Sequence, residues 1–459
     1  MTSTRSRDES DVELPLLRSG HGIDGDDASN LHLLDASREE SVQVSGRSGL
    51  AAGIANMSNS IIGAGIIGLP LAIAEAGFFT GIFLLVVLCG VTDWTIRLIV
   101  INSKLSGTSS YMGIMEYCFG RPGQIAVSTF QFVFACGGMA ACAYLTKATS
   151  STGDTIPHVL ASLLPQPVRE TALGAMLVNR QFIIALAIGG VAYPLSLYRD
   201  ISKLAKASSL AVLSMLVIVL SVVIRGPQVD PELKGSRAHV FTVIGPKVFE
   251  AIGVISFAYV CHHNSMLIYG SLERPTLDRF SAVTHISTLT SLICCLILSI
   301  SGYVVFTDKT QGNILNCFDE DDAVINIARL CFGLNMFTTL PLEVFVCREV
   351  IENLLERPFN YTRHWLVTTG LVFSAMLVSM TTCDLGIVLE LTGGLSATAL
   401  AFLFPAACYY CLLSEPWYGR RKLCAAACTI FGIVVMVLSV FLALQKLYTG
   451  AETANKACS

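Results

Sequence analysis

Charged residues are scarce in this chain. Lys, Arg, Asp and Glu make up 14% of its 459 residues, whereas an average soluble domain has roughly 25%. The first 49 residues hold five basic and ten acidic residues, so the remainder is poorer still in charge. That remainder forms apolar runs long enough to cross a bilayer. These features exclude a soluble protein and predict an all-α polytopic membrane protein.

The chain also lacks the signatures of several function classes. Its formal net charge is −4, and without a basic field we expect no nucleic-acid binding. It has no nucleotide-binding loop, nucleophile elbow or paired catalytic carboxylates, so we expect neither an enzyme nor an ATP-driven pump, and no cofactor. No signal peptide precedes the first apolar run, which we expect to act as the insertion signal.

Apolar runs of about 20 residues predict eleven membrane spans. They comprise residues 50–77, 79–101, 124–146, 182–198, 204–224, 246–269, 281–306, 323–347, 366–383, 385–413 and 423–444. The lysines and arginines of the loops favour a cytoplasmic N-terminus. We therefore expect a disordered cytoplasmic tail at 1–49, a transmembrane domain at 50–444 and a short non-cytoplasmic tail at 445–459.

The first span contains residues that disfavour a continuous helix. It reads Asn59-Ser-Ile-Ile-Gly-Ala-Gly-Ile-Ile-Gly-Leu-Pro70, and its glycines and Pro70 weaken a helix in mid-membrane. Unpaired backbone at that depth persists only where it lines a cavity or is buried in protein. The sequence therefore predicts an unwound stretch, with close packing through small residues as the alternative.

The sixth span combines an apolar run with polar groups. Glu250, His262, His263 and Asn264 lie within or beside it, and such groups usually serve a transport pathway or pair internally. Because the interruptions fall in the first and sixth spans, we interpret spans one to five and six to ten as inverted repeats. The adjacent histidines have no Cys, Asp or Glu one turn away, so we expect no metal site there. They remain candidates for gating, with structural hydrogen bonding as the alternative.

The eighth span carries hydroxyl groups and a carboxylate. Thr338 and Thr339 precede Pro341, and Glu343 follows. Hydroxyl oxygens can bind Na⁺, whereas a buried carboxylate such as Glu343, Glu250 or Asp93 could carry a proton. The alternatives are threonines bonded to the backbone one turn earlier and a pair between Glu343 and Arg348.

Nearly all of the sixteen cysteines fall in apolar runs, where a thiol behaves as a small hydrophobe. Cys317 and Cys458 lie in hydrophilic stretches, which leaves one disulfide between them open. Cys408 and Cys411 have the spacing of a redox pair, but no thioredoxin-like pattern surrounds them, and we expect helix packing.

The interrupted spans also carry a family resemblance. The run from Asn59 to Pro70 and Cys261-His-His-Asn-Ser-Met-Leu-Ile-Tyr-Gly-Ser-Leu272 resemble the signatures of sodium-coupled neutral amino acid transporters, members of the amino acid/auxin permease superfamily. The animal member numbered eleven and fungal vacuolar amino acid transporters are especially similar. The resemblance covers residues 50–444 and implies an eleven-helix fold, a LeuT-like five-plus-five inverted repeat with one extra helix.

The resemblance also implies a site. The backbone of Gly63, Ala64, Gly65 and Ile66 would hold the amino acid's carboxylate and amine, and Phe257, Ala258 and Cys261 would shape the side-chain pocket. Asn59, the backbone carbonyl of Ile62, Thr338 and Thr339 would bind the cation between the first and eighth spans. Beyond Na⁺ we expect no metal.

We therefore predict a secondary active transporter of neutral amino acids, coupled to Na⁺ or H⁺ and working by alternating access. Its partners would be the amino acid and membrane lipid, in a vacuolar or lysosomal membrane or the plasma membrane. The alternative is an amino acid-sensing receptor, in which a partner binds the N-terminal tail and carries the signal.

Overall fold

The computed structural model describes residues 49–63, 65–147, 186, 188–198, 202–236, 240–319, 321–355, 360–381 and 390–454. Regular structure in these ranges is helical, as the apolar runs predict. Residues 1–48 of the first predicted tail (1–49) lie outside the described residues, whereas residues 445–454 of the second (445–459) belong to the helix Arg420–Ala454. The first of them includes the segment proposed to bind a partner.

Seven described helical segments are long and apolar enough to cross a membrane. They are Phe78–Ser106, Leu210–Gln228, Val248–Ser271, Leu277–Lys309, Ala323–Leu355, Glu390–Leu412 and Arg420–Leu442. The pair Leu50–Ile61 and Ile66–Ala76 passes the same test jointly and bends by 45° at its break. These segments match predicted spans, so the chain is an integral, multi-pass membrane protein. The full count of eleven stays a prediction.

The helices follow one another as the apolar runs do. Their bounds are α2 (Leu50–Ile61), η1 (Ile66–Gly68), α3 (Leu69–Ala76), α4 (Phe78–Ser106), α5 (Tyr111–Lys147), α10 (Tyr193–Ser196), α11 (Ser202–Arg225), α12 (Val248–Tyr259), η4 (His262–Asn264), α13 (Ser265–Ser271), α14 (Leu277–Phe306), α15 (Ala323–Leu355), α16 (Tyr361–Thr381), η7 (Gly393–Ala397), η8 (Ala399–Leu403), α18 (Phe404–Leu412) and α19 (Arg420–Ala454). The predicted fourth span is described only at 186 and 188–198, where the π-helix η2 (Ile188–Ala192) leads into α10.

Two glycines set sharp turns between helices. Gly77, with φ +88°, joins α3 to α4, where only residue 78 separates the predicted spans 50–77 and 79–101. A Cβ atom there would lie 2.8 Å from the Gly245 nitrogen. Gly120, with φ +67°, bends α5 just before Pro122. An L-residue rarely adopts such a φ, so both turns favour glycine.

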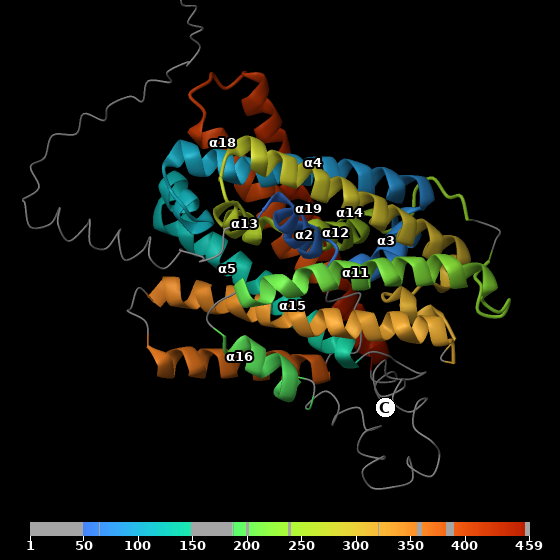
Figure 1. Cartoon of the computed structure of the whole chain (residues 1–459). Coiled ribbons are helices and arrows are strands. Elements are labelled where there is room, and N and C mark those ends of the chain that lie inside the picture. Colours follow the sequence, from blue (N-terminus) through green and yellow to red (C-terminus); the bar gives the residue numbers. More distant parts are fainter. Residues whose placement is uncertain are drawn as a thin grey trace, which may run out of the picture. The chain divides into compact units, whose positions relative to one another are not determined.

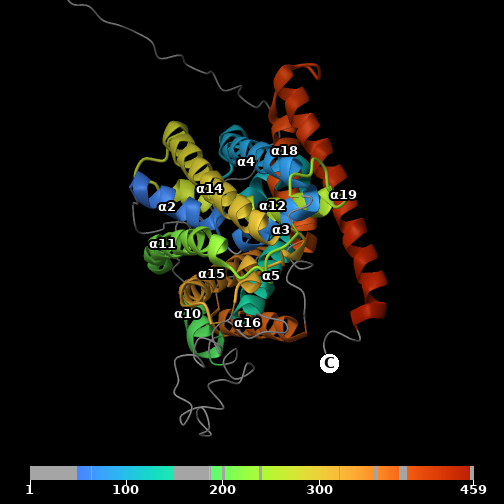
Figure 2. The ribbon, with the colours of Figure 1, turned by 90° about the vertical axis from the view of Figure 1, so that its right-hand side faces the viewer.

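The interrupted helices lie at the centre of the bundle. α12 packs against α3, α4, η7 and α19, and Figure 2 shows α12 and α3 in the middle with α19 at the edge. Figure 1 shows α4, α14, α11 and α15 running alongside one another around them. The span Val248–Ser271 is 78% buried, compared with 28% for Arg420–Leu442. The outer helices therefore present apolar side chains to lipid, and the broken helices face protein.

Cys317 lies in the connection between α14 and α15. It is a buried free thiol whose Sγ atom accepts a hydrogen bond from the Gln311 backbone N–H at 3.3 Å. Burial raises the pKa of this thiol to about 11. The structure thus shows Cys317 as an enclosed free thiol, and Cys458, the other cysteine of the possible disulfide, lies outside the described residues.

Candidate functional site

The first broken helix turns at Gly63. α2 ends with the Ile62 backbone N–H donating to the Ser58 carbonyl oxygen at 2.8 Å, and η1 begins with the Gly68 N–H donating to the Gly65 carbonyl oxygen at 3.1 Å. Ala64, between them, lies outside the described residues. Helix ends leave backbone N–H and C=O groups without partners in their own helix. The break therefore offers polar backbone inside the bundle, as the glycine run predicts.

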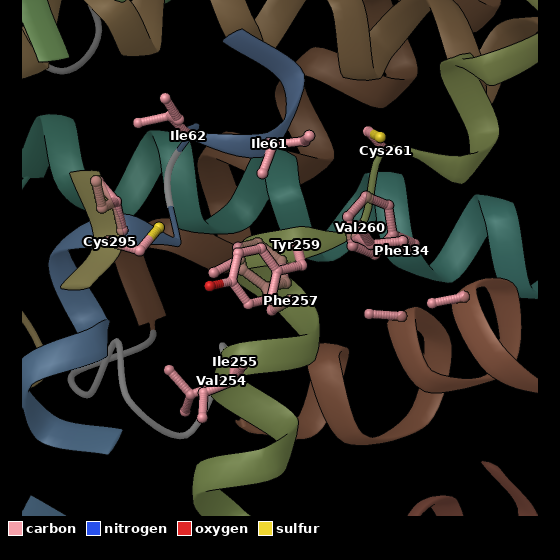
Figure 3. Packing of buried hydrophobic residues seen from close by; sticks show 14 of the residues in the cluster. Ile61, Ile62, Phe134, Val254, Ile255, Phe257, Tyr259, Val260, Cys261 and Cys295 are labelled. Atoms are coloured by element: carbon pink, nitrogen blue, oxygen red, sulfur yellow. The ribbon is translucent and has the colours of Figure 1, made fainter. Parts of the chain in front are cut away.

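The second break follows Tyr259. Val260 is extended, with φ −73° and ψ 116°, and the 3₁₀ turn η4 leads into α13. Figure 3 shows Tyr259, Val260 and Cys261 leaving α12, in one close-up with Ile61 and Ile62 at the end of α2. Both interruptions predicted from the sequence are therefore confirmed.

The two breaks touch through Gly65. A Cβ atom added at Gly65 would lie 2.5 Å from the Ala258 Cα atom and 2.9 Å from its Cβ atom. Because non-bonded carbon atoms normally approach to about 3.5–4.0 Å, only a glycine permits this contact. Gly63 differs, since a Cβ there would meet nothing closer than the Asn59 carbonyl oxygen at 3.6 Å.

A cavity of about 50 Å³ lies where the breaks meet α5 and α15. The lining residues are Asn59, Ser60, Ile61, Gly63 and Gly65 from the first broken span, Phe257, Ala258, Val260, His263 and Asn264 from the second, Phe134 and Gly138 from α5, and Thr339, Leu342 and Glu343 from α15. One water molecule needs about 10–15 Å³ of such space, so the cavity has room for a few waters. An amino acid requires it to open further.

Many of the predicted site residues come together at this cavity. Those on the wall are Asn59, Gly63, Gly65, Phe257, Ala258, His263, Thr339 and Glu343. Ile62, Ile66 and Cys261 are buried in the packed core, and the roles predicted for Ile62 and Ile66 concern their backbone groups. The side chain of Thr338, like Ala64, lies outside what the structure describes.

Two of the predicted cation ligands, Asn59 and Thr339, have a side-chain oxygen and line the cavity. Asn59 Oδ1 is buried with no hydrogen-bond partner among the described residues. Thr339 Oγ1 donates its proton to the Asn335 carbonyl oxygen at 3.0 Å, which leaves its lone pairs available. The backbone bond expected as the alternative for this threonine is thus present, and it does not prevent ligation.

The two adjacent histidines differ in their surroundings. His262 is fully buried, and its Nε2 atom lies 2.9 Å from Thr95 Oγ1 on α4, which fits the structural alternative. His263 faces the cavity, and neither of its ring nitrogens has a partner in the described part of the chain. Its ring packs against Phe134 with centroids 5.1 Å apart.

Glu343 stands apart from the arginine considered as its partner. Arg348 donates to the carbonyl oxygens of Ser196 (2.9 Å) and Tyr198 (3.3 Å), and to Thr368 Oγ1 (3.1 Å). These bonds tie α15 to α10 and α16. The pair between Glu343 and Arg348 is therefore not formed, because the guanidinium points to the other side of α15.

The other two carboxylates of interest lie away from the cavity. Glu250 meets Glu75 and Glu390, with oxygen atoms within 4.8 Å of one another, and the Lys247 Nζ atom lies 3.5 Å from Glu75 and 3.9 Å from Glu250. The three carboxylates of this cluster are close enough to coordinate one metal ion, an arrangement that the sequence did not suggest.

Asp93 pairs with Arg97 on α4 at 2.9 Å and with His285 on α14 at 2.8 Å. It also accepts a hydrogen bond from Thr288 Oγ1 at 3.1 Å. These contacts place Asp93 in a polar cluster between two neighbouring helices, where its carboxylate already has partners.

Sequence reasoning missed the contribution of α5. Phe134 packs on Phe257 with ring centroids 5.5 Å apart, and a Cβ atom at Gly138 would lie 3.3 Å from the Glu343 Cδ atom. The spacing of Phe134 and Gly138 by one helical turn was the available signal. Nothing in the third span alone says which neighbour it faces.

Comparison with known proteins defines the class. A family described as transmembrane amino acid transporter protein matches residues 46–449. "Vacuolar amino acid transporter 2" of Saccharomyces cerevisiae is 39% identical over 396 residues, 84% of this chain and 81% of that protein. "Putative sodium-coupled neutral amino acid transporter 11" is 38% identical over 400 residues in Danio rerio, 86% of each chain, and 36% identical over 374 residues in Homo sapiens, 81% of this chain and 89% of that one.

The chain is therefore a polytopic membrane transporter by fold and relationship. It belongs to the transmembrane amino acid transporter family. The family resemblance identified from the two interrupted spans is confirmed. No relative reported above is named as a receptor, so the receptor alternative has no support.

Proposed function

We propose that this protein is a secondary active transporter that moves neutral amino acids with Na⁺ or H⁺ by alternating access. The observation that carries the proposal is the cavity where both broken helices meet and where Asn59 and Thr339 face the same space. Broken helices five spans apart at one site are typical of inverted-repeat transporters. This supports an eleven-helix fold with a LeuT-like repeat.

The chemistry of the breaks suits a zwitterion. N–H groups at a helix start carry partial positive charge and favour a carboxylate, whereas C=O groups at a helix end favour an ammonium group. The breaks at Gly63 and Val260 supply both kinds of group to one cavity. Phe257, Ala258 and Phe134 then provide an apolar wall for a small side chain.

The cation would sit between the first and eighth spans. Asn59 Oδ1 and Thr339 Oγ1 supply hard oxygen atoms, which Na⁺ prefers, and Ile62 and Thr338 complete the proposed set. The relatives' names do not decide the ion, because one is called sodium-coupled and the other is called vacuolar with no ion named. A proton would instead use a carboxylate, and Glu343 is the carboxylate in the wall.

The size of the cavity supports alternating access. At about 50 Å³ it is too small for an amino acid, so the helices around it must separate to load and release substrate. We propose that the two broken spans move against α5 and α15. We also propose a cytoplasmic N-terminus, from the loop charges.

Filling the cavity tests the proposed site. Leu342→Trp should weaken binding of a labelled neutral amino acid to the purified protein at least tenfold, because the ring occupies the space of the substrate. Leu334→Trp is the matched control, since Leu334 lies on the same helix and is 50% exposed toward lipid. Equal binding by both variants, each folded by thermal melting, would place the substrate elsewhere.

A further inference from the structure

A single carboxylate stands in the wall of the cavity. Glu343 is the only Asp, Glu, Lys or Arg among the described lining residues. Its Oε2 atom is buried and has no hydrogen-bond partner in the described part of the chain. No described lysine or arginine forms a salt bridge with it, and Arg348 points elsewhere.

Apart from His263, the described groups that line the cavity with Glu343 supply no positive charge. Gly138 on α5 has no side chain, so its backbone approaches the Glu343 carboxylate closely. A Cβ atom added at Gly138 would lie 3.3 Å from the Glu343 Cδ atom. Phe134 and Phe257 flank the same cavity, and aromatic faces attract cations. Of the other lining residues, only His263 can ionise.

Charge balance then limits what the closed site can hold. A zwitterionic amino acid brings no net charge, so it leaves a buried carboxylate uncompensated, which is costly. One additional positive charge removes that penalty. A coupling ion can provide it, and so can an ammonium group on the side chain of the substrate.

We propose that Glu343 admits one monovalent positive charge beside the amino acid zwitterion, and that the ammonium group of a cationic side chain takes the place of the coupling ion there. This rests on the proposed function as an ion-coupled carrier. Neutral amino acids then require the ion, and cationic amino acids of similar size do not. Glu343 is thus a specificity-determining residue, and the substrate range extends to cationic amino acids.

Two amino acids of nearly equal shape test this. Norvaline ends in a methyl group where 2,4-diaminobutyrate ends in an ammonium group. In liposomes containing the purified protein, removal of the Na⁺ and pH gradients should lower norvaline uptake at least tenfold and diaminobutyrate uptake less than twofold. Glu343→Gln should raise the half-saturating concentration of diaminobutyrate at least tenfold more than that of norvaline.

The control is Glu352→Gln, which makes the same change on the same helix beside His364 and away from the cavity. It should leave the ratio of the two half-saturating concentrations as in the wild type. If Glu343→Gln does not transport, ligand-induced thermal stabilisation in detergent measures the same ratio.

Three outcomes would overturn the proposal. The first is that the wild-type protein does not take up diaminobutyrate. The second is that diaminobutyrate uptake depends on the ion gradients as strongly as norvaline uptake does. The third is that Glu343→Gln leaves the ratio of the two half-saturating concentrations unchanged. If the wild type accumulates neither amino acid and is stabilised by neither, the carrier function itself is refuted and this inference falls with it. Norvaline uptake without diaminobutyrate uptake refutes the role of Glu343 alone.

Discussion

Gly65→Ala should disturb the contact between the two broken helices. The added Cβ atom would lie 2.5 Å from the Ala258 Cα atom and 3.0 Å from the Ala258 nitrogen. Carbon atoms need about 3.5–4.0 Å, so the first break must move away from α12 by roughly 1 Å. Two of the atoms in the way are backbone and the third is the Ala258 Cβ atom at 2.9 Å, so no side-chain rotation relieves the clash.

The expected magnitude follows from that displacement. Overpacking a tight contact destabilises a protein by about 1–3 kcal/mol. If the strain separates the breaks that would hold the substrate, affinity falls by the corresponding factor of about 5 to 150. Adding Ala258→Gly to the Gly65→Ala variant should not restore the affinity, because the Cα atom of residue 258 remains in the way.

The assay compares Gly65→Ala with Gly63→Ala. Both glycines line the cavity, but a Cβ at Gly63 meets nothing closer than 3.6 Å. Thermal melting in detergent should show a clear loss of stability for Gly65→Ala and a small change for Gly63→Ala, and a labelled amino acid should bind more weakly to the former. Equal melting temperatures for the two variants would refute the close approach of the breaks.

Three further predictions concern single residues. Asn59→Ala should weaken ion-dependent uptake while the amount of folded protein stays constant, because it removes a cation ligand; parallel loss of both would make Asn59 structural. Arg348→Met should lower stability by about 1–3 kcal/mol, since it removes the hydrogen bonds to the Ser196 and Tyr198 carbonyl oxygens and to Thr368 Oγ1, and an unchanged melting temperature would contradict these contacts. Burial raises the pKa of Cys317 from 9.0 to about 11, which lowers the fraction of reactive thiolate at pH 7 about a hundredfold. Cys317 should therefore react with a maleimide about a hundredfold more slowly than an ordinary thiol, and rapid labelling would show that the loop is open.

The sequence predicts the two breaks because their residues are unfavourable in a continuous helix. The glycines before Pro70 and the histidines after Tyr259 each conflict with a buried span, and the structure interrupts the helix at both places. A local conflict of this kind is visible without knowing any neighbour. The family resemblance depends on these same segments, and for the same reason it could be identified.

Contacts between distant spans could not be predicted in this way. Nothing in the third span indicates that Gly138 faces Glu343. Arg348 is close to Glu343 in sequence, yet its hydrogen-bond partners Ser196 and Tyr198 lie about 150 positions away. Asp93 pairs with His285 across 192 positions. Such pairs depend on how helices are oriented about their axes, which an apolar run does not specify.

Uptake into liposomes tests the central claim most directly. Purified protein would be reconstituted and given a panel of labelled amino acids, with either a Na⁺ gradient or a pH gradient imposed. The account predicts concentrative uptake of a small neutral amino acid driven by one of these gradients and absent from protein-free liposomes. Dependence on Na⁺ would assign Asn59 and Thr339 as ligands, and dependence on pH would assign the role to Glu343. Binding of the amino acid without uptake under either gradient would contradict a coupled transporter.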